Sequence, residues 1–96
     1  MALYLVLIGK TNTGYSAHCP DVPGCAATGK TVEEVVRRMT GALEFHLEGL
    51  AEDGEPIPEP GGVNSYQQIL NEGEADQYLM AHLPVDTSRF LSPTLH

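Results

Sequence analysis

Residues 19–50 read CPDVPGCAATGKTVEEVVRRMTGALEFHLEGL, and this stretch decides how the rest of the chain must fold. The two prolines fix the backbone angle φ on either side of a dipeptide, and the glycine after them supplies the freedom that a tight reversal needs. The stretch therefore begins with a preset turn between two strands. The residues of this structural motif are Pro20, Asp21, Pro23, Gly24 and Cys25.

A long amphipathic helix is expected after the turn. Thr31 and Glu34 have the spacing of a capping box, in which the Thr31 hydroxyl accepts a first-turn N–H and the Glu34 carboxylate accepts the N–H of Thr31 itself. The helix should end near Glu52, because Asp53 and Gly54 form a typical helix stop. Apolar residues recur every three or four positions and predict one stripe, which needs a sheet to pack on: Val32, Val35, Val36, Met39, Leu43, Leu47 and Leu50.

Four other segments have the composition of β-strands. Ala2–Ile8 is continuously apolar, which is typical of a central strand or one covered on both faces. Tyr15–Cys19 and Cys25–Thr28 flank the turn, and Tyr78–Val85 is the fourth strand. Ser65–Asn71 predicts a short helix between the long helix and this last strand.

The order of these elements predicts an α+β fold. The first three strands would form an antiparallel meander, and a right-handed crossover through the long helix would place the fourth strand beside the first and parallel to it. We therefore expect a four-stranded mixed sheet in the order 3-2-1-4, with the long helix packed on one face. Residues 1–87 would form one domain and residues 88–96 a C-terminal tail.

The charge of the chain is strongly acidic and unevenly placed. Five Lys and Arg face thirteen Asp and Glu, which gives a net charge of -8. Ten of the acids lie between Met39 and Ser88, where there is no Lys or Arg. Such a surface aids solubility, repels nucleic acid and attracts basic proteins. The candidate partner-binding residues are Glu44, Glu48, Glu52 and Asp53.

Length and hydropathy indicate where the protein resides and whether it associates. No apolar run is long enough for a membrane span, and the apolar N-terminal run lacks the basic leader and cleavage site of a signal peptide. We expect a cytoplasmic protein with reduced cysteines. A 96-residue domain buries a modest core, so association into a dimer or a larger homo-oligomer is expected.

The residue patterns predict no catalysis, no cofactor and no metal site. A two-metal nuclease needs converging carboxylates, and the first strand contains none. His18 and Cys19 are adjacent and would point to opposite faces of a strand, so they cannot easily share a metal ion with Cys25 or His46. Residues 24–31, GCAATGKT, match the phosphate-loop pattern letter for letter, but no long buried parallel strand precedes them. We therefore expect no nucleotide binding.

The sequence also resembles the HicB-type antitoxin family. The resemblance covers roughly residues 3–60 and rests on separated elements in the right order: Pro20, Asp21, Pro23, Gly24, Cys25, Thr28, Gly29, Thr31, Glu33, Glu34, Gly54, Pro56, Ile57, Pro58 and Pro60. It implies a partial RNase H-like fold without the nuclease carboxylates. It also implies a small HicA-type mRNA-cleaving toxin as partner.

The expected function is therefore that of a non-enzymatic antitoxin that covers the active surface of a small basic toxin. The alternative is a structural or regulatory oligomer of the same fold without a toxin partner. Many proteins of the family carry a further DNA-binding segment, and only eleven residues follow Val85. We therefore expect no direct binding of nucleic acid by this chain.

Overall fold

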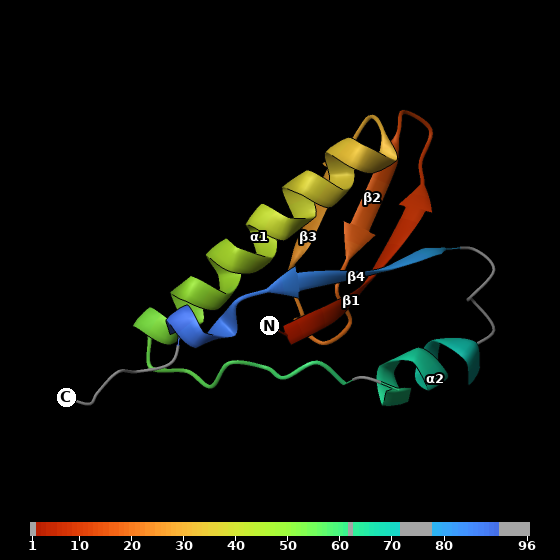
Figure 1. Cartoon of the computed structure of the whole chain (residues 1–96). Coiled ribbons are helices and arrows are strands. Elements are labelled where there is room, and N and C mark those ends of the chain that lie inside the picture. The colour runs from red at the N-terminus through yellow and green to blue at the C-terminus, as the bar shows by residue number, and fades with distance from the viewer. Residues whose placement is uncertain (1, 62, 72–77, 91–96) are drawn as a thin grey trace.

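The computed structural model describes residues 2–61, 63–71 and 78–90. Figure 1 shows one long helix lying across a small sheet, with a short helix at the opposite side of the molecule. The elements follow in the order β1 (Ala2–Lys10), β2 (Tyr15–His18), β3 (Ala26–Gly29), α1 (Val32–Glu52), α2 (Val63–Asn71), β4 (Leu79–Val85) and the 3-10 helix η2 (Thr87–Phe90). Neither described helix is long and apolar enough to cross a membrane.

The sheet has the predicted strand order, β3-β2-β1-β4, but it is not mixed. All of its pairings are antiparallel, and β4 runs opposite to β1, with Ala2 beside Val85 and Ile8 beside Leu79. The prediction of a parallel fourth strand is therefore wrong. The reason is the path after α1: an extended segment, residues 55–61, and then α2 carry the chain past β1 before β4 begins (Figure 1). The rule for a single helical crossover therefore does not apply.

The central strand β1 is buried on both faces, as its apolar run predicts. Successive side chains of a strand point to opposite faces. On one face Tyr4 and Val6 pack against α1, and on the other Leu5 and Leu7 pack against Ile69 of α2. The sheet thus lies between two helices of very different length.

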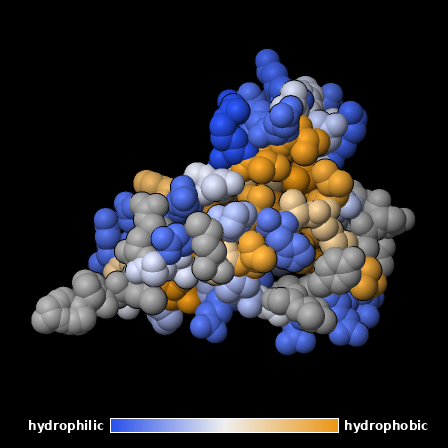
Figure 2. Space-filling view, in the orientation of Figure 1, coloured by the Kyte–Doolittle hydropathy of each residue, from blue (hydrophilic) through white to orange (hydrophobic). Residues whose placement is uncertain are grey.

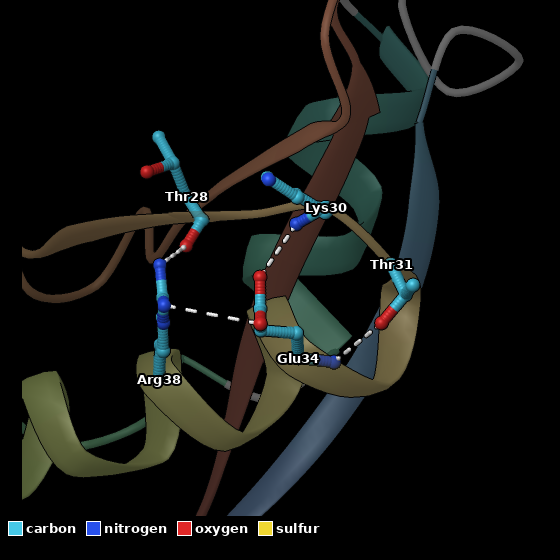
Figure 3. A network of polar contacts seen from close by, with 5 residues as sticks. All are labelled: Thr28, Lys30, Thr31, Glu34 and Arg38. Carbon is cyan, nitrogen blue, oxygen red and sulfur yellow. Dashed lines mark hydrogen bonds and ion pairs between the residues drawn. The ribbon is translucent and has the colours of Figure 1, made fainter.

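The start of α1 has the predicted capping box with one difference (Figure 3). The N–H of Glu34 donates to the Thr31 hydroxyl at 3.0 Å, as expected. The Glu34 carboxylate accepts the N–H of Lys30 at 2.7 Å rather than that of Thr31. Arg38 lies one turn further on, with Nη2 3.8 Å from Glu34, and its Nη1 donates to the carbonyl of Thr28 at 3.2 Å. The cap thereby joins α1 to the end of β3.

The remaining boundaries agree closely with the sequence analysis. Within the predicted stripe, the fully buried residues are Val35, Met39, Leu43 and Leu47. Asp53 caps the end of α1, and Gly54 follows with φ +75°, a conformation that favours glycine. The short helix α2 begins at Val63, two residues earlier than predicted. Helix η2 occupies residues 87–90, and the remainder of the predicted tail lies outside the described residues.

Replacing Leu43 by Ala should lower the free energy of unfolding by about 2–5 kcal/mol, because the side chain is fully buried between α1 and the sheet. Urea unfolding followed by circular dichroism measures this loss. Arg37→Ala, on an exposed position of the same helix, is the matched control and should change the stability little. A loss below about 0.5 kcal/mol for Leu43→Ala would contradict the packing described here.

Candidate partner-binding surface

The acidic residues predicted to bind a partner lie on the C-terminal half of α1. Glu44, Glu48 and Glu52 follow one another at intervals of four residues, so they form one row on the helix. Glu48 and Glu52 are exposed and Glu44 is half-buried. Asp53 is exposed at the C-cap, where it adds to the negative charge at that end of the helix. The structure therefore brings the first three together in a row and places the fourth at its end.

The described basic side chains lie at the other end of the molecule. Lys10 ends β1, where its amino group lies 5.3 Å from the centre of the Tyr15 ring. Lys30 precedes α1, and Arg37 and Arg38 occupy its first half. Glu33 and Glu34 balance these two arginines in the first half of α1, whereas the second half carries acidic residues alone. The C-terminal half of α1 is therefore the strongly negative part of this helix.

The phosphate-loop pattern forms a helix cap in this structure. Gly29, Lys30 and Arg38 line a polar hollow of about 480 Å³ beside the start of α1. In a phosphate loop, backbone N–H groups point at the phosphates. Here the N–H of Lys30 donates to the Glu34 carboxylate, which places negative charge where a phosphate would have to lie (Figure 3).

Hydrophobic side chains add a second property to the surface. Figure 2 shows hydrophobic surface between the upper part of α1 and β4, with hydrophilic surface above and below it. The exposed large hydrophobic residues among those described are Leu3, Phe45, Leu70 and Leu79. Phe45 is the most exposed of them, at 80%, and lies beside Glu44 and Glu48 on α1. The sequence analysis missed it, although a large aromatic residue outside the apolar stripe is a signal for exposure.

The proline-rich segment after α1 is fixed by two polar contacts. The Tyr4 hydroxyl donates to the carbonyl of Pro58 at 2.6 Å. The N–H of Gly61 donates to the carboxylate of Asp21 at 2.8 Å. Asp21 belongs to the turn between β2 and β3, so this turn and the first strand together hold residues 55–61 in place.

The turn itself is closed by its own backbone. The N–H of Cys19 donates to the carbonyl of Cys25, and the N–H of Cys25 donates to the carbonyl of Val22. Gly24 has φ +86°, which explains why glycine is required there. The turn predicted from the sequence is therefore a structural element. It also holds the Asp21 carboxylate where it accepts the N–H of Gly61.

Burial controls the chemistry of the cysteines. It raises the pKa of Cys19 to about 11 and also raises the pKa of Cys25, so both thiols are protonated at neutral pH. Burial, followed by the charges of Cys19, Asp21 and Glu59, raises the pKa of Tyr4. Within the described part of the chain, no group of three or more His, Cys, Asp or Glu is placed to hold a metal ion.

Replacing Tyr4 by Phe should destabilise the fold by about 0.5–1.5 kcal/mol, because it removes the hydrogen bond to Pro58 and keeps the ring. Urea unfolding measures the change. Tyr15→Phe is the control, since its ring contact with Lys10 does not need the hydroxyl. Equal stability of Tyr4→Phe and the wild type would show that this contact does not hold the proline-rich segment.

Cys19 should react slowly with a thiol reagent in the folded protein. A rise of its pKa from the ordinary 9.0 to about 11 reduces the thiolate fraction near pH 8 roughly 100-fold, and burial limits access further. Peptide mapping after timed alkylation measures the rate at this residue, with the urea-unfolded chain as reference. Similar rates in the folded and unfolded chains would rule out the buried position of the thiol.

The comparisons with known proteins agree with this fold. A family model described as HicB_like antitoxin of bacterial toxin-antitoxin system matches residues 4–95. An uncharacterized 14.9 kDa protein in the rep-hol intergenic region of Haemophilus phage HP1 is 35% identical over 89 residues, which cover 93% of this chain. The matched region amounts to 65% of the length of the phage protein.

Solved structures have the same arrangement of elements. The crystal structure of antitoxin HicB3 has a TM-score of 0.78 at 22% identity, covering 98% of this chain and 69% of that one. A chain of the HicA3 and HicB3 toxin-antitoxin complex has a TM-score of 0.68 at 26% identity, covering 88% of this chain and 98% of that one. Because the family model spans nearly the whole sequence and the solved antitoxins share its fold, this chain belongs to the HicB-like antitoxin family of bacterial toxin-antitoxin systems.

Proposed function

We propose that this chain neutralises a small basic HicA-type mRNA-cleaving toxin by binding it and covering its active surface. The observation that carries the proposal is the likeness to a chain of the HicA3 and HicB3 complex, at 26% identity over 88% of this chain. A toxin that cleaves mRNA must bind a polyanion, so its active surface should be basic. The acidic half of α1 is the complementary surface on this chain.

The contact residues in this proposal are Glu44, Glu48, Glu52 and Asp53. Opposed potentials of this kind speed the encounter of two proteins, whereas the final affinity depends on buried apolar contacts. Phe45 stands beside the acidic row and is 80% exposed, so it can supply such a contact. The toxin would meet one apolar side chain surrounded by carboxylates.

The antitoxin would act by binding alone, in the cytoplasm where mRNA is cleaved. The central strand of the sheet presents buried apolar side chains from Tyr4 to Ile8, which offer no carboxylate to a pair of catalytic metal ions. Direct binding of nucleic acid is disfavoured by the net charge of -8. Inhibition by covering the toxin needs neither activity.

Co-expression with a HicA-type toxin, such as a small basic protein encoded next to this chain, should give a complex and restore growth. Reversing the charge of the acidic row in Glu44→Lys/Glu48→Lys should lower the association rate constant about tenfold at low salt and change the dissociation rate less. Stopped-flow mixing measures both rates. The difference from the wild type should shrink at high salt, because screening weakens the attraction.

The matched control is Glu33→Lys, which reverses an exposed charge at the opposite end of α1. It should leave the association rate close to that of the wild type. Absence of both a complex and growth rescue would instead favour an oligomer that works without a toxin. Equal slowing by Glu33→Lys and by the reversed acidic row would place the toxin elsewhere on the chain.

A further inference from the structure

A second hollow, here called the C-terminal hollow, lies at the end of α1 beside the Phe45 ring. It has a volume of about 240 Å³ and is lined by Phe45, His46, Gly49, Leu50 and Asp53. Cofactor and substrate pockets usually have about 300–1,000 Å³, so this one suits a single side chain. We propose that the C-terminal hollow receives one arginine side chain of the basic toxin. The source of that arginine rests on the proposed function, whereas the chemistry of the hollow does not.

The spacing of residues along α1 builds this hollow. Phe45, Gly49 and Asp53 follow one another at intervals of four residues, so they lie on one side of the helix. A Cβ atom added at Gly49 would meet no other group within 4 Å. The missing side chain of Gly49 therefore leaves an open floor, with an aromatic ring at one end and a carboxylate at the other.

The walls of the hollow suit the flat guanidinium group of arginine. The Phe45 ring is 80% exposed, and His46 and Leu50 are half-buried beside it. The face of an aromatic ring attracts a cation, and a guanidinium also stacks on it, which the compact ammonium group of lysine cannot do. The methylene groups of an arginine can pack along Leu50 at the same time.

The charges around the hollow favour a cation. Asp53 lines it and is exposed, and the row of Glu44, Glu48 and Glu52 adds negative charge along the same half of α1. The last turn of α1 contains no basic residue, although the helix dipole favours a cation there. The arginines of α1 cannot fill this place. Arg38 is eleven residues before Gly49, roughly 16 Å along the axis, and contacts Glu34 and the Thr28 carbonyl.

An arginine bound in the hollow would act as the anchor of the complex. Residues that dominate binding energy are often arginines or aromatic residues that fill a pocket from which water is excluded. The acidic row would speed the encounter through long-range attraction, whereas the filled hollow would slow dissociation. Substitutions in the row and in the hollow should therefore change different rate constants.

Gly49→Leu tests the hollow in the complex with a HicA-type toxin, because the new side chain fills the space without entering the core. It should raise the dissociation rate constant at least about tenfold and leave the association rate constant close to that of the wild type. Gly41→Leu is the matched control, since an added Cβ atom is equally unobstructed there and Gly41 lies on the other side of Phe45 from the hollow. Both variants should melt at a slightly higher temperature than the wild type, because leucine favours a helix more than glycine does. Loss of folding would then not explain loss of binding.

A second experiment tests the chemistry of the hollow without any toxin. Nα-acetyl-arginine amide is titrated into the full chain, and the amide signals of Gly49 and Asp53 are followed by NMR. Both signals should shift at millimolar concentrations of this probe, and the shifts should disappear in Gly49→Leu. The matching citrulline amide has nearly the same shape without the charge and should cause no such shift. The lysine amide has the same charge without the flat group and should need a several-fold higher concentration.

The two experiments separate failure of this inference from failure of the proposed function. A stable toxin complex that Gly49→Leu leaves unchanged would overturn the inference and leave the proposed function standing. Faster dissociation in Gly49→Leu without any response to the arginine amide would assign the hollow to an apolar side chain of the toxin, which also overturns it. Arginine-specific shifts in a chain that binds no toxin would support a site for an arginine side chain and reject the toxin as its source.

Discussion

The burial of β1 on both faces is the constraint on which the rest of the structure depends. Five consecutive residues from Tyr4 to Ile8 are buried, and their side chains alternate between the two faces of the sheet. One face needs α1 and the other needs a second cover, which Ile69 of α2 helps to supply. In so small a domain, little core would remain if either cover were lost.

The requirement for a second cover also determines the direction of the last strand. After α1 the chain must reach the opposite face of the sheet before it can return. Residues 55–61 make that passage, held by Tyr4 at one point and by Asp21 at another. The prolines in this segment lack N–H groups and keep it extended, so it spans the distance without forming a helix of its own. The strand that follows therefore enters at the end of β1 and runs antiparallel to it.

The two sides of the long helix α1 differ sharply in burial and charge. Its inward side holds Val35, Met39, Leu43 and Leu47 against the sheet, and its outward side carries the charged row and Phe45. Substitutions on the outward side can therefore change the charge and shape of the surface without removing core contacts. An exposed phenylalanine costs little in stability there, while it offers apolar area to any protein that covers it.

The sequence alone determined the elements whose causes are local. The capping box of Thr31 and Glu34, the stripe of α1, the turn at Gly24 and the central position of β1 depend on residues within a few positions of one another. The row of Glu44, Glu48 and Glu52 was also predictable, because residues four apart share one side of a helix. These features need no knowledge of distant contacts, and the strand order followed from them.

Only the tertiary structure decided the direction of β4, the contact between Asp21 and Gly61, and the exposure of Phe45. The bond from Gly61 to Asp21 joins residues that are forty positions apart, and no spacing rule links them. The direction of β4 depended on where a proline-rich segment crosses the molecule. Phe45 is exposed because the opposite side of α1 is buried against the sheet. Which side of a helix faces solvent depends on what packs against it, so only the tertiary structure decides it.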